Sequence, residues 1–387
     1  MVARVVVAGT HSGVGKTTVA TGLMAAFAAR GRAVAGFKVG PDFIDPSYHA
    51  LATGRPGRNL DAFLSGPELV APLLAHGSSG ADLAVVEGVM GLFDGAQGGG
   101  ELASTAQVAR LLGAPVVLVV DAAGMARSVA AVVHGFATWD PGVRLAGVIL
   151  NRVGSDRHEE LLREALAPDG PPVLGVLRRR DALATPERHL GLVPAAERRA
   201  QAARTVAELG RVLAAAADLD AIAALAAAAP ALPATAWDPA TAAAVAGEAR
   251  AGRARVAVAA GPAFTFVYEE NLELLRACGV ELAGFDPTAD EALPEGAGGL
   301  YLGGGFPETY GEALAANRSL RAAVRAFATA GRPVVAECGG LLYLGRSLDG
   351  RPMCGVVAAE GRMAGRLTLG YRRAVAAAPS VLAGAGR

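Results

Sequence analysis

The sequence between residues 9 and 18, GTHSGVGKTT, has the composition and spacing of a phosphate-binding loop, and it follows a short apolar run. Glycines let backbone N–H groups turn toward phosphate oxygens. Lys16 can reach the β- and γ-phosphates, and the Thr17 hydroxyl can bind Mg²⁺. The strict pattern places a glycine where this chain has Thr10, so the loop is a variant one. We expect nucleotide to bind at Thr10, Ser12, Gly13, Val14, Gly15, Lys16, Thr17 and Thr18.

His11 separates two classes of protein that carry such a loop. The partition and septum-site ATPases, which this region resembles, have a second lysine at that position, and the lysine acts across a nucleotide-sandwich dimer. This chain has histidine there. The difference favours a metabolic enzyme over a non-enzymatic ATPase switch of the partition type.

Acidic residues follow two other apolar runs, where ligands gather on open parallel sheets. Asp42 and Asp45 come shortly after Lys38, and Glu87 and Asp94 bracket a second loop. Mg²⁺ prefers hard oxygen ligands, so carboxylates at strand ends suit it. Lys38 is placed to neutralise an anionic substrate or a transferring phosphoryl group. The alternative is that the aspartates only cap turns beside proline and glycine.

Cys338 lies in the sequence ECGG, between an apolar run and an expected helix. A nucleophile on a sharp strand-to-helix turn is held out of the sheet, and a helix N-terminus stabilises a thiolate. Gly303, Gly304 and Gly305 end the preceding strand and could present backbone N–H groups to an oxyanion. The alternative for a free cysteine is a small buried apolar residue.

Five segments together resemble the cobyrinic or hydrogenobyrinic acid a,c-diamide synthases of cobalamin biosynthesis. The first half is also similar to dethiobiotin synthetase, and the second half looks like a class I glutamine amidotransferase. The resemblance runs in order along nearly the whole chain. Its segments are residues 9–18, 38–46, 87–94, 186–194 and 301–308.

The resemblance implies an ATP- and Mg²⁺-dependent ligase that forms carbon–nitrogen bonds. ATP phosphorylates a peripheral carboxylate of a corrinoid acid, and ammonia released from glutamine displaces the phosphate, at side chains a and c in turn. Cobyric acid synthase and nickel-sirohydrochlorin a,c-diamide synthase share the same motifs and stay open as alternatives.

The resemblance also implies a role for each motif residue. Lys16 and Thr17 bind phosphate and Mg²⁺, and Glu87 is a metal ligand. Asp45 and Asp94 support metal binding and phosphoryl transfer, and Cys338 forms the γ-glutamyl thioester. The carboxylate-bearing arm of the substrate is placed by Asp42, Phe43 and Ile44.

The histidines do not fit the amidotransferase pattern. A thiolate nucleophile usually needs a histidine base, yet the six histidines are at positions 11, 49, 76, 134, 158 and 189, all in the first half. The family's Gly-His-Glu-Phe-His-like segment is expected shortly after residues 367–372, and the chain ends at Arg387. Either the chain is truncated, which we favour because the family pattern runs in register to the end, or the enzyme uses free ammonia.

Short Val/Ile/Leu runs alternate with helical spacing in both halves, which predicts α/β domains with parallel sheets. We expect a P-loop doubly wound domain over 1–226, an Ala/Pro-rich linker over 227–254 and an incomplete amidotransferase-like domain over 255–387. Strands are expected at 5–8, 33–38, 83–87, 116–120, 145–150, 255–260, 280–285, 299–302 and 333–337, and helices at 16–30, 101–112, 124–138, 156–166, 196–229, 268–278, 318–330 and from 339.

Composition excludes several other classes. The 387 residues are 52% hydrophobic, so the chain is not largely disordered, and 36 basic residues balance 36 acidic ones, which argues against a dedicated nucleic-acid-binding protein. Cys278, Cys338 and Cys354 are too few and too dispersed for a disulfide scaffold. No run of about 20 apolar residues and no signal peptide is present, so we expect no membrane contact and a cytoplasmic setting.

Overall fold

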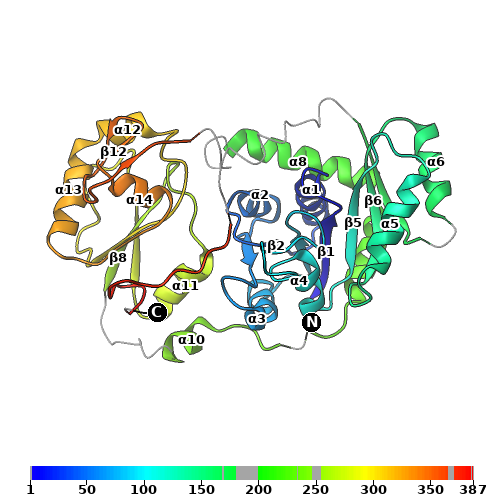
Figure 1. Ribbon diagram of the computed structural model, residues 1–387, viewed down its shortest axis with the longest axis horizontal. Helices are drawn as coiled ribbons and strands as arrows, with labels where there is room; N and C mark the ends of the chain where they lie inside the picture. Colours follow the sequence, from blue (N-terminus) through cyan, green and yellow to red (C-terminus); the bar gives the residue numbers. More distant parts are fainter. Residues whose placement is uncertain are drawn as a thin grey trace. The chain divides into compact units, whose positions relative to one another are not determined.

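The computed structural model describes residues 2–167, 170–179, 199–232, 234–245, 254–364, 370–384 and 386. These residues form two compact units, Met1–Trp237 and Asp238–Arg387 (Figure 1). The division falls inside the range predicted to be a linker, 227–254, although a short helix also lies there, α10 (Pro239–Val245). The family-like segment 186–194, with His189, lies outside the described residues.

The first unit is built on a seven-stranded, wholly parallel sheet of order β3-β2-β4-β1-β5-β6-β7. Its strands are apolar on both faces because both faces are covered: Val6 packs in one core cluster, and its neighbours Val5 and Val7 pack in another. The doubly wound α/β prediction is confirmed. The strands are β1 (Ala3–Gly9), β2 (Val34–Val39), β3 (Arg58–Leu60), β4 (Leu83–Glu87), β5 (Val116–Asp121), β6 (Leu145–Val153) and β7 (Val173–Arg178).

Helices lie on both faces of this sheet (Figure 1). One face is covered by α3 (Pro67–Gly77), α4 (Thr105–Leu112), α5 (Ser128–Thr138) and α6 (Asp156–Leu166). The other is covered by α1 (Lys16–Ala29), α2 (Ile44–Thr53), α8 (Arg199–Ala216) and α9 (Leu219–Ala227).

The prediction of a helix over 196–229 is wrong in one respect, because the helix is interrupted between α8 and α9. Asp218 is the cause: its carboxylate accepts a hydrogen bond from Ala221 N (2.9 Å) and so begins a new helix. Its own N–H donates to Leu174 O (2.7 Å), which ties the break to strand β7.

The second unit has a smaller parallel sheet of order β11-β10-β8-β9, as expected for a second α/β domain. Its strands are β8 (Arg255–Ala259), β9 (Glu281–Phe285), β10 (Gly299–Leu302) and β11 (Val334–Ala336). Its further helices are α11 (Glu269–Ala277), α12 (Gly311–Ala316), α13 (Arg318–Thr329) and α14 (Gly339–Leu344). Three short strands form a separate sheet: β12 (Ser347–Leu348), β13 (Arg351–Pro352) and β14 (Glu360–Gly361). Across the described part of both units, no helix is long and apolar enough to cross a bilayer.

Candidate active sites

The glycine-rich loop connects the end of β1 to the first residue of α1. Gly15 has φ +98°, which favours glycine, and a Cβ there would lie 2.4 Å from Asn151 Nδ2. Lys16 is the first residue of α1, so the helix N-terminus faces the loop, as the sequence predicts.

Two side chains near the end of β6 donate hydrogen bonds to backbone oxygens of this loop. Asn151 Nδ2 donates to Val14 O (2.8 Å), and Arg152 donates to Gly13 O (3.1 Å) while pairing with Asp121 Oδ2 (2.6 Å). The sequence analysis missed both residues. The signal was available, because they directly follow a predicted strand, as the carboxylates do.

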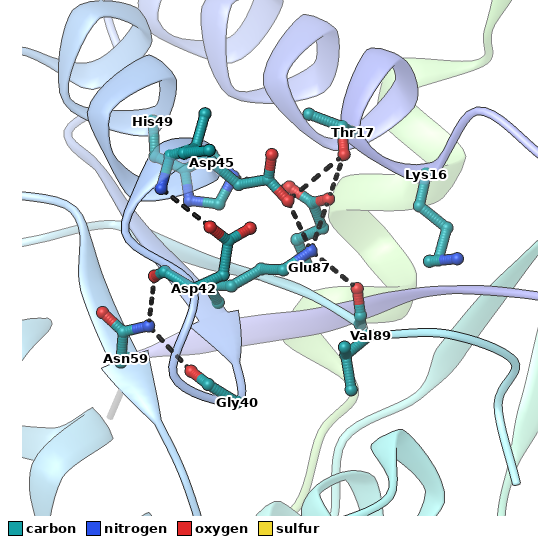
Figure 2. A network of polar contacts seen from close by, with 12 residues as sticks. Lys16, Thr17, Gly40, Asp42, Asp45, His49, Asn59, Glu87 and Val89 are labelled. Atoms are coloured by element: carbon teal, nitrogen blue, oxygen red, sulfur yellow. Dashed lines mark hydrogen bonds and ion pairs between the residues drawn. The ribbon is translucent and has the colours of Figure 1, made fainter. Parts of the chain in front are cut away.

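Thr17, Lys38, Asp45 and Glu87 come together in one buried polar network (Figure 2). Lys38 Nζ lies 2.6 Å from Asp45 Oδ2 and 2.8 Å from Glu87 Oε1, and it also donates to Gly88 O (3.0 Å). The Thr17 hydroxyl donates to Glu87 Oε1 and lies 3.4 Å from Asp45 Oδ2. The sheet explains the meeting, because Lys38 on β2 is the direct register partner of Glu87 on β4.

The network balances one ammonium against two carboxylates. Burial by itself would lower the pKa of Lys38, but the charges of Glu87 and Asp45 outweigh it and raise that pKa. Burial would likewise raise the pKa of Glu87, yet Lys38 and His49 hold it well below its usual value. Burial and the neighbouring Glu87 charge raise the pKa of Asp45 well above its usual value.

Lys16 stands apart from this network in Figure 2. Its Nζ donates to His11 O (3.0 Å), and its side chain is mostly buried. Burial, followed by the positive charge of Lys38, lowers the pKa of Lys16 to about 8. A bound phosphate would reverse that shift by supplying negative charge.

Asp42 and Asp94 cap turns at the edge of the site. Asp42 Oδ1 accepts from Ile44 N and Asp94 Oδ2 accepts from Gly91 N, each at 2.8 Å. Asn59, which the sequence analysis missed, fixes the first of these loops by donating to Gly40 O and Asp42 O, both at 2.7 Å (Figure 2). Both aspartates still act on the site electrostatically, since Asp42 raises the pKa of Lys38 and Asp94 that of Lys16.

Phe43 and Ile44 lie between Asp42 and Asp45, at the point where α2 begins. Both side chains are partly exposed. They therefore adjoin Asp45, a residue of the carboxylate network, in the sequence.

In the second unit, Cys338 lies between β11 and α14 with φ +50°, an unusual conformation for a non-glycine residue, and its side chain is exposed. Cys354, in contrast, is buried. A Cβ on Gly304 would lie 3.3 Å from Cys338 Cβ, so the glycine run leaves room beside the thiol. This geometry is that of a nucleophile elbow.

The three glycines differ in what their backbones do. Gly304 N donates to Phe266 O (3.0 Å), so that N–H already has a partner, and Gly303 O accepts from Gly340 N (2.9 Å). Of the three N–H groups expected to face an oxyanion, that of Gly304 is therefore bonded to the backbone instead. On the neighbouring strand, Tyr301 OH donates to Glu337 Oε1 (2.8 Å), which fixes the residue before the cysteine.

Comparison with known proteins matches a family model to each half of the chain. The CobQ/CobB/MinD/ParA nucleotide binding domain matches residues 5–193, and the CobB/CobQ-like glutamine amidotransferase domain matches residues 255–381. The chain is 59% identical over 418 residues to the hydrogenobyrinate a,c-diamide synthase of Streptomyces coelicolor, which covers 100% of this chain and 85% of that protein. The chain belongs to the a,c-diamide synthase family.

Two further members are similar along the same length. The hydrogenobyrinate a,c-diamide synthase of Thermobifida fusca is 54% identical, over 99% of this chain and 82% of that protein. The cobyrinate a,c-diamide synthase of a Synechococcus strain is 44% identical, over 97% of this chain and 82% of that protein. As a member of this family, the chain is a carbon–nitrogen ligase with a nucleotide-binding domain and a glutamine amidotransferase domain.

The chemistry of the first site fits Mg²⁺. Thr17, Asp45 and Glu87 offer one hydroxyl and two carboxylates, the hard oxygen ligands that Mg²⁺ prefers. The described residues contain no group of three or more His, Cys, Asp or Glu side chains that could hold a metal ion by themselves. Mg²⁺ commonly binds through one or two carboxylates together with substrate phosphates, which is what this donor set allows.

Proposed function

We propose that the first unit uses ATP and Mg²⁺ to phosphorylate the a and c carboxylates of hydrogenobyrinic acid, and that ammonia from glutamine then converts each into an amide. The observation that carries the proposal is the buried network of Thr17, Lys38, Asp45 and Glu87 beside the phosphate-binding loop. The cobalt-free substrate is chosen because relatives at 59% and 54% identity carry its name, whereas the 44% relatives carry that of cobyrinate.

Each residue of the first site has a part in this reaction. Lys16 binds the β- and γ-phosphates, and Lys38 stabilises negative charge that develops on the transferring phosphoryl group. Thr17, Asp45 and Glu87 would hold Mg²⁺, which would supply charge neutralisation at the phosphate oxygens.

Around these groups, the rest of the loop (Thr10, Ser12, Gly13, Val14, Gly15 and Thr18) cradles the phosphates. Asp94 tunes the charge of Lys16, and the substrate arm binds at Asp42, Phe43 and Ile44.

In the first step, a substrate carboxylate oxygen attacks the γ-phosphorus, and ADP leaves as the acyl phosphate forms. Ammonia then attacks the acyl carbon, and phosphate leaves with one oxygen from the original carboxylate while a proton is lost from nitrogen. In the second unit, Cys338 Sγ attacks the side-chain amide of glutamine and releases ammonia, and water hydrolyses the resulting thioester to glutamate.

An oxygen-labelling experiment tests the central step. Hydrogenobyrinic acid labelled with ¹⁸O in its carboxylates is incubated with the protein, ATP, Mg²⁺ and ammonium. We expect one labelled oxygen in inorganic phosphate for each amide formed, and a product about six mass units lighter than the fully labelled acid after both conversions, since each amide exchanges one ¹⁸OH for NH2. Unlabelled phosphate alongside amide formation would show that no acyl phosphate forms, and undiminished amidation by Lys16→Ala would remove the phosphate-binding loop from the reaction.

A substrate panel separates the related amidases. Hydrogenobyrinic acid, cobyrinic acid, their a,c-diamides and nickel-sirohydrochlorin are offered in parallel, and products are counted by mass. Turnover of the a,c-diamides would indicate a cobyric acid synthase type of activity, and preference for cobyrinic acid would indicate the cobalt-containing substrate.

A further inference from the structure

His49 is a fully buried side chain of the first unit whose one hydrogen-bonding partner is a residue of the active site. It lies on α2, and its Nε2 is 2.7 Å from Glu87 Oε2, where both side chains have no exposed surface (Figure 2). Its other ring nitrogen, Nδ1, is buried without a hydrogen-bond partner. Burying an imidazole with only one of its two nitrogens hydrogen-bonded costs free energy, so the remaining hydrogen bond to Glu87 must be important at this position.

The two oxygens of Glu87 face different partners. Oε1 meets the Lys38 ammonium and the Thr17 hydroxyl, whereas Oε2 meets His49. An ionised carboxylate can only accept, so His49 Nε2 carries the proton of this hydrogen bond and donates it to Glu87 Oε2. One contact thus fixes the rotation of the carboxylate about its long axis.

We propose that His49 is a positioning residue that holds Glu87 Oε2 and thereby turns Oε1 toward Lys38, Thr17 and the metal. The inference rests on the proposed role of Glu87 as a metal ligand. Outer hydrogen-bonding partners of metal-binding carboxylates orient them in this manner in metal sites generally.

Helix α2, which carries His49, packs closely on the neighbouring strand β2. A Cβ on Gly36 of β2 would lie 2.8 Å from His49 Cβ, closer than side chains tolerate. Asp45 and His49 are also one helical turn apart on α2, so the same helix face delivers both groups to the network. An apolar residue would fill this core position more cheaply, so a buried imidazole paired with Glu87 indicates a requirement for its hydrogen bond.

The test compares His49→Leu with His49→Gln, whose amide nitrogen can replace Nε2, and His49→Asn, whose shorter amide cannot reach Glu87. Met24→Ala is the matched control, since Met24 is buried beside Gly36 and touches none of the polar network by hydrogen bonds. Mn²⁺ affinity is measured by electron paramagnetic resonance with a non-hydrolysable ATP analogue bound. The apparent KM for Mg²⁺ and kcat are measured separately.

We expect His49→Leu and His49→Asn to weaken Mn²⁺ binding by about 10- to 100-fold, the usual effect of losing such a partner. His49→Gln should recover most of the affinity, and metal-free binding of the analogue should be unchanged. Met24→Ala should lower the unfolding temperature and leave Mn²⁺ affinity as it is. If His49→Leu does not fold, the comparison of Gln with Asn decides the question alone.

Glu87→Gln separates failure of this inference from failure of the proposed function. Weak Mn²⁺ binding by Glu87→Gln together with normal binding by His49→Leu and His49→Asn would overturn the role of His49 and leave that of Glu87 intact. Normal binding by Glu87→Gln would overturn the proposed metal ligand itself. In the double variant with Glu87→Gln and His49→Leu, the second substitution should cause no further loss of Mn²⁺ affinity. An additive loss of affinity would show that His49 acts independently of Glu87.

Discussion

Replacing Lys38 by methionine will destabilise the first unit, and the size of the loss will depend on pH. Lys38 is the cation that both buried carboxylates contact, and the side-chain exposures of Lys38, Glu87 and Asp45 are 5%, 0% and 11%. Methionine keeps the length and apolar stem of the side chain. The substitution therefore removes the charge without opening a large cavity.

The magnitude follows from the burial of the two carboxylates. Removing one partner of a buried ion pair costs about 3–5 kcal/mol, because the remaining charge is left without compensation. At about 1.4 kcal/mol for each factor of ten, the ratio of folded to unfolded protein should fall by roughly 100- to 4000-fold at pH 8.

The pH dependence has a definite sign. Lys38 keeps the pKa of Glu87 below its usual value, so in the wild type this carboxylate stays ionised between pH 8 and pH 5 and its contribution to stability is constant there. In Lys38→Met, only the contact with His49 still opposes the effect of burial, so the pKa of Glu87 rises from its wild-type value. Protonation then relieves the unpaired charge as the pH falls, and the difference in stability between the two proteins should narrow toward pH 5.

Urea unfolding followed by tryptophan fluorescence measures this loss in the first unit alone, because both tryptophans, Trp139 and Trp237, belong to it. Arg30→Met is the matched control: Arg30 pairs with Asp220 at 2.8 Å, but both side chains are largely exposed, and no measurable loss is expected. A loss below about 1 kcal/mol at pH 8, or an equal loss at pH 5 and pH 8, would refute the argument.

Three further predictions concern the two sites. ATP binding near pH 8 should take up protons, because phosphate raises the pKa of Lys16 from about 8, and the affinity for ATP should fall at higher pH. Titration calorimetry in two buffers of different ionisation enthalpy measures the proton uptake. Lys16→Ala should abolish this uptake. Gly15→Ala should eliminate nucleotide binding in a fluorescent-ATP assay, since its φ is +98° and Asn151 fills the space; binding within twofold of wild type would contradict this. Cys338→Ser should abolish glutamine-driven amidation and leave ammonium-driven amidation within twofold of wild type, because the thiol acts only on glutamine; loss of both activities would contradict this.

The sequence alone was sufficient for the parts of the protein whose signal is local. Short valine-rich apolar runs such as residues 116–120 favour strands buried on both faces, and the spacing GVGKTT between strand and helix predicts the phosphate-binding loop. The elbow at Cys338 is likewise visible from its neighbours in the chain. The prediction of a helix over 196–229 was wrong because alanine favours helix throughout this stretch. The interruption depends on one residue, Asp218, which caps the second helix.

Tertiary structure decided which of these local pieces meet. Lys38 and Glu87 are far apart in the chain and become neighbours only because β2 and β4 pair in register, an order that helix packing on both faces sets. His49 and Asn151 carry no local motif, since their importance lies in hydrogen bonds to residues distant in sequence. Hydrophobic periodicity is a property of one segment, whereas the choice of which strands pair depends on the free energy of burying all segments together. For this reason, the balance between the Lys38 ammonium and the carboxylates of Asp45 and Glu87 could be recognised only in the folded structure.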